Sequence, residues 1–130
     1  MHPNPLQAYQ SVEKATLPGR LIEARVLSQA ALKLRKCQEG WDRADRVNAL
    51  DEALRYNQRV WTILQAELGS QDNPMPDQIK RNLLLLSAFI DRRIFETMIS
   101  PSPEKLNIII NINENIAAGL RDKELVESVS

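Results

Sequence analysis

Apolar residues recur every three or four positions along most of the chain, which is the period of an α-helix and not of a strand. The most regular stripe has the spacing 3, 4, 3, 4, 3, 4 and comprises Val47, Leu50, Leu54, Asn57, Trp61, Leu64 and Leu68. A second stripe with this rhythm comprises Leu106, Ile109, Asn113, Ile116 and Leu120. Such stripes are typical of helices packed side by side in antiparallel directions. The sequence therefore predicts an all-α protein.

Glycine and proline separate the periodic segments from one another. Proline blocks a helix interior and glycine weakens one, so their positions mark helix boundaries. We expect Asp42 to cap the third helix, Gly69 to follow it at C′, and Gly119 to end the fifth. Ser102 is the expected cap of the fifth helix, with Pro103 at its first position. The predicted helices are Leu6–Ala15, which is short, and then Arg20–Gln38, Arg43–Leu68, Asp77–Ile99 and Pro103–Ala118.

These elements predict an antiparallel helical bundle of four main helices plus a short N-terminal helix. Residues 1–130 form a single helical domain in this interpretation, with residues 1–17 as a mobile N-terminal segment and 121–130 as a frayed tail. The helix expected over Asp77–Ile99 is apolar around most of its surface, because Leu84, Leu85 and Phe89 widen the face that carries Leu83. A helix of that kind is expected at the centre of the fold.

Three polar residues lie on apolar faces. Asn57 and Asn113 each interrupt a stripe, and Glu23 precedes the apolar run that contains Leu27, Ala30 and Leu34. A buried amide without a partner costs about 1–3 kcal/mol. We expect all three to make polar contacts that fix the helix register. The alternatives are that each caps a helix end or faces solvent, or that it contacts a partner directly.

Composition and missing motifs argue against an enzyme. The chain has 130 residues, with 17 basic and 17 acidic side chains and one histidine, His2. The single cysteine, Cys37, excludes an intramolecular disulfide and a cysteine-based zinc site. With one histidine we expect neither a nucleophile–base pair nor a histidine-rich metal site, and there is no glycine-rich phosphate loop. We therefore expect a non-enzymatic protein without a cofactor or a metal.

The same composition bears on location. The first residues lack the apolar core of a secretory signal. The most apolar run, Leu83–Ile90, is far shorter than the roughly 20 residues of a membrane helix. We expect a cytoplasmic protein that does not enter a membrane.

Nucleic acid is a weaker candidate partner, because the net charge is zero. The basic residues are nevertheless uneven, since residues 1–65 carry ten basic and seven acidic groups. A basic cluster of this kind around Trp41 could contact RNA phosphates, although a solvated face explains it more simply and no RNA-binding motif accompanies it. The cluster comprises Lys33, Arg35, Lys36, Arg43 and Arg46.

Several short motifs in a fixed order carry a family resemblance. After Tyr9 and the pair Glu23-Ala24 come the stretch 53–62 (ALRYNQRVWT), the stretch 73–76 (NPMP) and the stretch 112–120 (INENIAAGL). In this order and spacing the chain resembles the FlaF family of flagellar biosynthesis proteins from alphaproteobacteria. It departs from the family pattern at Val60 and Met75, where leucine is usual, and just ahead of Glu23.

The resemblance implies a cytoplasmic protein that is needed for flagellin production and export. It would act on flagellin itself as a chaperone, alongside or in opposition to the regulator FlbT. An RNA-binding regulator of flagellin translation is the alternative.

The ends of flagellin are amphipathic helices that stay unpaired until assembly, so a helical domain could shield them in an apolar groove. The candidate groove residues lie off the main stripes, whereas Trp61 lies on one and is expected in the core. For each candidate the alternative is an ordinary residue of the surface or of the outer core. The candidates are Tyr9, Leu17, Ile22, Trp41, Tyr56, Val60 and Leu84.

Overall fold

The computed structural model describes the backbone of residues 23–129 and the side chains of residues 23–121. Within this range the chain forms helices and turns and no strand, which confirms the all-α prediction. The short helix expected over Leu6–Ala15 and the N-terminal segment 1–17 lie outside the described residues.

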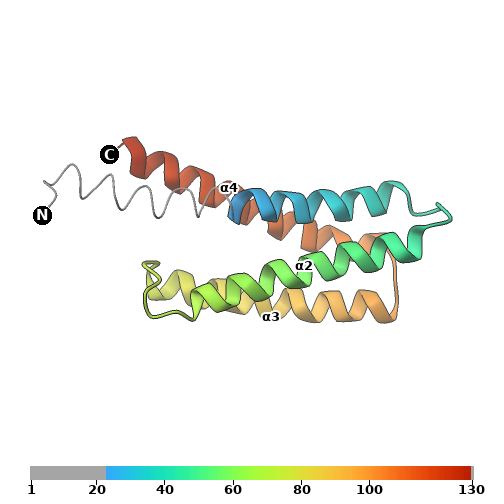
Figure 1. The fold of residues 1–130 in the computed structure, drawn as a ribbon, viewed down its shortest axis with the longest axis horizontal. Coiled ribbons are helices and arrows are strands. Elements are labelled where there is room, and N and C mark those ends of the chain that lie inside the picture. The colour runs from blue at the N-terminus through green and yellow to red at the C-terminus, as the bar shows by residue number, and fades with distance from the viewer. Residues whose placement is uncertain (1–22, 130) are drawn as a thin grey trace, which may run out of the picture.

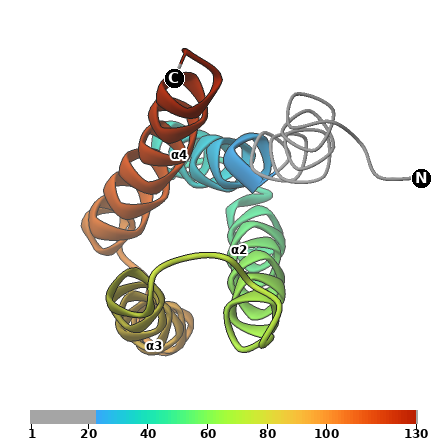
Figure 2. The same ribbon diagram turned by 90° about the vertical axis from the view of Figure 1, so that its left-hand side faces the viewer.

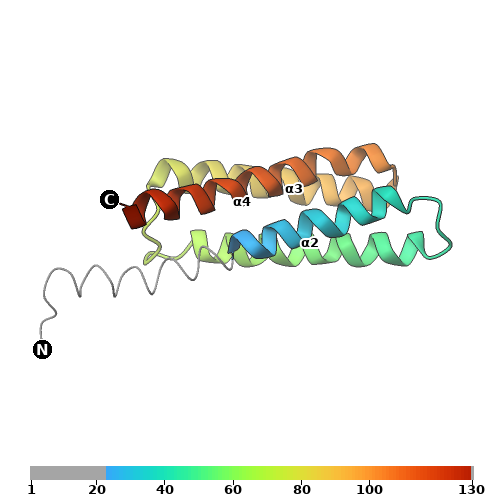
Figure 3. The ribbon, with the colours of Figure 1, turned by 90° about the horizontal axis from the view of Figure 1, so that it is seen from above.

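The four long helices that the structure describes lie side by side and alternate in direction (Figures 1 and 3). The first is helical from residue 23 to residue 39 and is called the 23–39 helix below. It is followed by α2 (Arg46–Leu68), α3 (Asp77–Ile99), a 3₁₀ turn η1 (Pro103–Lys105) and α4 (Leu106–Val129). Figure 2 looks along the helices and shows the 23–39 helix and α3 at opposite corners, with α2 and α4 between them.

The bounds of α3 agree with the sequence prediction, but α2 begins at Arg46 instead of Arg43. Asp45 takes the N-cap position, and Asp42 lies in the turn before it, so the predicted cap is wrong. The Arg43 N–H donates to the Gly40 carbonyl (3.0 Å) and the Arg46 N–H to the Arg43 carbonyl (3.2 Å). Because these two bonds close a turn, the helix can begin only after it.

The end of α2 is closed without a left-handed glycine. Gly69 is the C-cap residue, with φ of −78°, and not the C′ residue that we expected. The side chain of Asn73 takes over part of the capping, because its amide nitrogen donates to the Glu67 carbonyl (3.1 Å). Its oxygen accepts from the Met75 N–H (2.9 Å), so this one side chain joins α2 to the loop before α3.

Gly119 does not end the last helix. Pro103 starts η1 after an extended Ser102, and α4 then continues through Gly119 to Val129. Glycine costs a helix only about 1 kcal/mol relative to alanine, which packing beyond it can offset. Leu120 is buried, and Arg121 donates to the Ser28 hydroxyl (2.9 Å) on the 23–39 helix.

The buried residues follow the predicted stripes, except at the N-terminal ends of α2 and α3 and on the wider apolar surface of α3. Val47 and Ile79 are exposed, whereas Trp61 is fully buried. The prediction that α3 is central is wrong, since Leu84, Leu85 and Phe89 are exposed. Successive residues of a helix point about 100° apart, so its apolar residues can lie on different faces. The neighbours of α3, which are α2 and α4, bury only one of these faces. The buried residues of α3 are Leu83, Ser87, Ile90, Ile94 and Thr97.

A buried polar network joins the 23–39 helix, α2 and α4. The side-chain amide of Asn113 donates to the Asn57 oxygen (2.6 Å), and the Trp61 indole N–H donates to the Asn113 oxygen (2.8 Å). The Asn57 amide donates to the carbonyls of Ala30 (3.1 Å) and Ala53 (2.9 Å). All three side chains of the network have an exposed fraction of 0%. The network pairs both amides that the apolar stripes contain.

Polar contacts nearer the surface join two further helix pairs. Arg35 on the 23–39 helix binds Glu114 on α4 through two hydrogen bonds (2.9 and 2.8 Å), and these bonds lower the pKa of Glu114. The pair therefore stabilises the fold above the ordinary pKa of a glutamate, and this contribution is lost as pH falls through the lowered pKa. On the other side, Gln65 of α2 donates to Ser87 and Asp91 of α3.

The network predicts a coupled effect of two substitutions. Asn57→Leu leaves the Asn113 amide without its acceptor and should lower the free energy of unfolding by about 1–3 kcal/mol. Asn113→Leu should cost more, because it leaves both the Asn57 oxygen and the Trp61 indole N–H without a partner. The double variant should lose less free energy of unfolding than the two single variants together, because it contains neither amide and so leaves neither one without its partner. Urea unfolding measures all three. Asn48→Leu, on the exposed side of α2, is the matched control, and additive effects of the two core substitutions would contradict the network.

The course of α4 predicts that Gly119→Ala stabilises the protein. A Cβ atom at Gly119 would meet nothing within 4 Å. The gain should be about 0.5–1 kcal/mol in the free energy of unfolding, because alanine loses less backbone entropy in a helix. Urea unfolding tests it, with Gly40→Ala as a control that should give no gain, since its Cβ would lie 2.6 Å from the Arg43 side chain. A destabilised Gly119→Ala variant would argue against an intact helix at this point.

Candidate partner-binding surfaces

The side of α3 that faces away from the core exposes five large apolar side chains. This surface, called the α3 outer face below, includes both phenylalanines of the chain. Three of these side chains belong to a regular stripe, because the five positions Leu85, Ala88, Arg92, Phe95 and Ile99 follow the 3, 4, 3, 4 spacing of helix packing. The exposed apolar residues are Leu84 (39%), Leu85 (71%), Phe89 (40%), Phe95 (64%) and Ile99 (67%).

One cation lies in the middle of this stripe. Arg92 is exposed and forms no ion pair with any residue that the structure describes. Its neighbour Arg93 pairs with Glu96 (3.6 Å) and lies 5.6 Å from the ring of Phe89. The α3 outer face is therefore an apolar stripe with a central positive charge. Contiguous apolar patches on a soluble protein commonly mark interaction sites.

A second surface is the groove between the 23–39 helix and α2, called the 23–39/α2 groove below. At one end it holds an apolar cleft of about 190 Å³. Val60 lies at its base and is only 9% exposed, while Ile63 on its rim is 62% exposed. The charged residues that line this cleft are both glutamates, Glu23 and Glu67. The other lining residues are Val26, Leu27 and Leu64.

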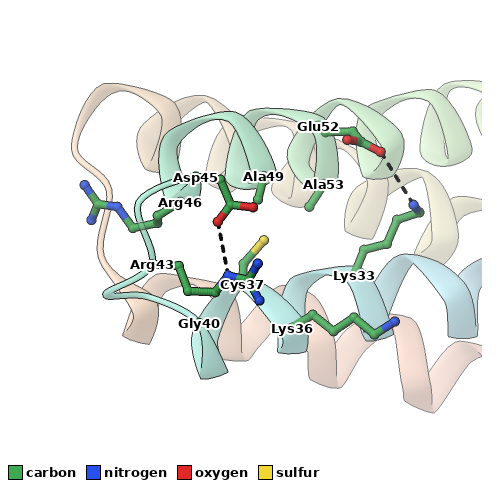
Figure 4. A pocket seen from close by; sticks show the side chains of 10 residues that line it. All are labelled: Lys33, Lys36, Cys37, Gly40, Arg43, Asp45, Arg46, Ala49, Glu52 and Ala53. Atoms are coloured by element: carbon green, nitrogen blue, oxygen red, sulfur yellow. Dashed lines mark hydrogen bonds and ion pairs between the residues drawn. The ribbon is translucent and has the colours of Figure 1, made fainter.

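At the other end of the groove lies a cationic cleft of about 290 Å³ (Figure 4). Figure 4 shows Lys33 reaching from the 23–39 helix towards Glu52 of α2, and the atoms of this ion pair are 3.9 Å apart. Arg43 pairs with Asp45 (3.1 Å) in the turn that closes the groove. Lys36 and Arg46 also line the cleft and form no ion pair with the described residues.

The thiol of Cys37 forms part of the wall of the cationic cleft. Burial raises the pKa of Cys37, and the carboxylates of Glu52 and Asp45 add to the rise while Lys33 opposes it. A thiol with a raised pKa is protonated at neutral pH and is a poor nucleophile. The cleft can therefore offer charge and shape, but not a reactive thiolate.

The structure does not gather the predicted partner-binding residues on one surface. Tyr9, Leu17 and Ile22 lie outside the described residues. Val60 belongs to the core, contrary to its interpretation as a residue that the core leaves over, because the 23–39 helix packs against its side of α2. Leu84 lies on the α3 outer face.

The two aromatic candidates are half-buried, and each lies beneath a cation. The Arg46 guanidinium is 4.7 Å from the Trp41 ring, and the Lys33 ammonium is 5.0 Å from the Tyr56 ring. Of the polar residues, Asn57 and Asn113 are buried in the network, and Glu23 is partly exposed at the apolar cleft.

Sequence reasoning missed most of the α3 outer face. Leu85 and Phe89 were expected in the core, and Phe95 and Ile99 were not singled out. A signal was present, since α3 carries two apolar stripes of helical spacing on different faces. Among the described helices, α2 and α4 pack against one of these stripes and leave the other exposed.

Two kinds of site find no support among the described residues. No group of three or more His, Cys, Asp or Glu side chains within 23–121 is placed to hold a metal ion. Among the helices that the structure describes, none has the length and apolar character to cross a membrane.

Comparison with known proteins identifies a family. The family model described as "Flagellar protein FlaF" matches residues 5–120, which is most of the chain. The comparisons with curated proteins and with solved structures found no match to this chain.

The environment of Cys37 predicts slow thiol chemistry. Because the thiol is 7% exposed and its pKa is raised, a chromogenic disulfide reagent should react with the native protein at least about tenfold more slowly than with the urea-unfolded chain. Because the pKa of Cys37 is raised, its reaction rate should also rise only at a higher pH than the rate of an ordinary thiol does. A cysteine placed at the exposed neighbour Ala44 in a Cys37→Ala background is the control. Equal rates for native and unfolded protein would show that Cys37 is accessible.

Proposed function

The chain belongs to the FlaF family of flagellar proteins, and from that premise we propose that it binds flagellin through the α3 outer face. In this proposal it supports the synthesis and export of flagellin as a chaperone and regulator, without enzymatic activity. The single observation that supports the proposal most is the exposure of both phenylalanines and three aliphatic side chains on one face of α3.

The chemistry of the α3 outer face suits an amphipathic helix. A partner helix with apolar residues at i, i+3 or i+4 and i+7 would cover the stripe from Leu85 to Ile99. Full burial of each large apolar side chain stabilises a complex by about 1.5–3 kcal/mol. Leu85, Phe95 and Ile99 are more than 60% exposed and contribute most of this gain, whereas Leu84 and Phe89 are already more than half buried and contribute less. Arg92 at the centre of the stripe favours a partner with a carboxylate there.

The proposal has three further parts. The four helices act as one antiparallel bundle, supported by their alternating directions and by the network that joins three of them. The protein works in the cytoplasm, where flagellin is made before export. FlbT is a second proposed partner, because the family resemblance implies that the two proteins act on the same process.

RNA binding is the second candidate function. The observation in its favour is the cationic cleft, where Lys33, Lys36, Arg43 and Arg46 lie together. Asp45 and Glu52 line the same cleft and reduce its positive potential, so the cleft is a weaker phosphate site than the number of its cations suggests.

The proposal predicts that charged substitutions on the α3 outer face weaken flagellin binding. Leu85→Asp and Phe95→Asp should each weaken binding to purified flagellin at least about tenfold, because each places a charge in the apolar centre of the contact. Both side chains are more than half exposed, so the fold should be unaffected. Ile63→Asp on α2 is the matched control, with an exposed fraction of 62%, and it should leave flagellin binding unchanged.

Isothermal titration at about 10 μM protein detects an affinity of about −7 kcal/mol or better. No binding of the unsubstituted protein to flagellin at that concentration would exclude the direct chaperone role. Loss of binding with Ile63→Asp but not with Leu85→Asp would move the site to the 23–39/α2 groove.

The RNA alternative requires an affinity for flagellin mRNA that falls steeply as the salt concentration rises, and an affinity that does not change with salt would exclude it.

A further inference from the structure

We propose that the 23–39/α2 groove is a second docking surface, which accepts an amphipathic helix of another protein in one orientation only. An apolar side chain of that helix enters the apolar cleft, and an acidic side chain nearer its C-terminus enters the cationic cleft. This inference goes beyond the proposed function, which uses the α3 outer face, and it stands on different residues.

The spacing of the two clefts matches three turns of a helix. Val26 and Leu27 line the apolar cleft, and Lys36 and Cys37 line the cationic cleft, ten residues further along the same helix. At 1.5 Å per residue the clefts are therefore about 15 Å apart. On a docked helix the side chains that point to the same side over that distance are about eleven residues apart, which is three turns.

The size of the apolar cleft indicates a single large anchor. Its volume of about 190 Å³ exceeds the roughly 150 Å³ of an apolar cavity that holds a benzene ring. Leu27, Val60 and Leu64 give it an apolar base. A leucine or phenylalanine side chain is the group that such a cleft accepts most favourably.

The charges of the groove differ between its ends. Four cations and two carboxylates line the cationic cleft, which leaves it net positive, whereas both charged residues of the apolar cleft are glutamates. The separation of about 15 Å is larger than the Debye length of about 8 Å at physiological salt, so a ligand meets the two ends as separate charges. A polyanion such as RNA, laid along the groove, would therefore meet repulsion at the Glu67 end.

These charges select the direction of a docked helix. The C-terminus of a helix carries a partial negative charge and its N-terminus a partial positive charge. The C-terminal end is therefore stabilised beside Lys36 and Arg46, and the N-terminal end beside Glu67. Between the clefts the docked helix passes over the Tyr56 ring, which Lys33 covers at 5.0 Å. Because Lys33 lies on a long flexible stem, it can turn towards an acidic side chain of the ligand.

Two synthetic peptides of identical composition test the orientation. Each has roughly 18 residues, or five helical turns, which is about the length of the 23–39 helix on one wall of the groove, on an alanine and glutamine background. The forward peptide has leucine on one helical turn near its N-terminus and two glutamates about eleven residues closer to its C-terminus. The reversed peptide has the opposite order. Both carry a dye and the same hydrocarbon staple, and circular dichroism checks that they are equally helical.

Fluorescence anisotropy with the full chain should show the forward peptide binding about tenfold more tightly than the reversed peptide at low salt. The difference should shrink at about 0.5 M salt, because screening weakens the ionic contacts. Ile63→Asp should abolish binding of the forward peptide, and Lys36→Glu should remove most of the preference for it. Leu85→Asp on the α3 outer face is the matched control and should change neither affinity.

Equal binding of the two peptides, or no binding of either at about 100 μM, would overturn the proposal. It would also be overturned if Leu85→Asp abolished binding while Ile63→Asp did not. Thermal melting of each variant shows whether it is folded, and a misfolded Ile63→Asp variant is replaced by Ile63→Lys. Failure of flagellin binding leaves this result unaffected, since the peptide assay contains no flagellin.

Discussion

The hydrogen-bonded chain of Trp61, Asn113 and Asn57 is the constraint on which the arrangement of the helices depends. Apolar side chains alone would allow α2, α4 and the 23–39 helix to slide by a turn at little cost, because apolar contacts are not directional. Two amides and an indole in a buried core allow only the register in which each finds its partner. That register aligns Val26 with Val60 and Lys33 with Glu52, so both clefts of the groove follow from it.

The fourth helix, α3, is held differently. It contributes nothing to the network, and its polar contacts to α2 are those of Ser87 and Asp91 with Gln65. Its buried face includes two hydroxyl side chains, Ser87 and Thr97, while both phenylalanines lie on the outside. A helix that keeps its largest apolar side chains in water is suited to be covered by another protein. The network and α3 thus have separate roles, one in fixing the fold and the other in presenting a surface.

Local signals in the sequence predicted the elements where no competing interaction was present. The bounds of α3 follow from Pro76 and from the prolines after Ile99, which cannot continue a helix. The prediction failed where a long-range contact outweighed a local preference. Gly119 is a poor helix residue, yet buried Leu120 and the bond from Arg121 to Ser28 carry α4 past it. Asp42 is a good cap, yet the turn from Gly40 to Arg46 delays the start of α2.

The amino-acid sequence by itself determined the helical class, the apolar stripes and the two amides that had to be paired, because these depend on periodicity and on the cost of burying a polar group. It also carried the family motifs. Only the tertiary structure decided which of the two apolar faces of α3 is buried and that Val60 belongs to the core. The basic cluster around Trp41 was visible in the sequence, but only the tertiary structure placed Glu52 beside it and turned Arg35 away to Glu114. The physical reason is that burial is a property of neighbouring helices, and a single helix cannot specify which of its faces they cover.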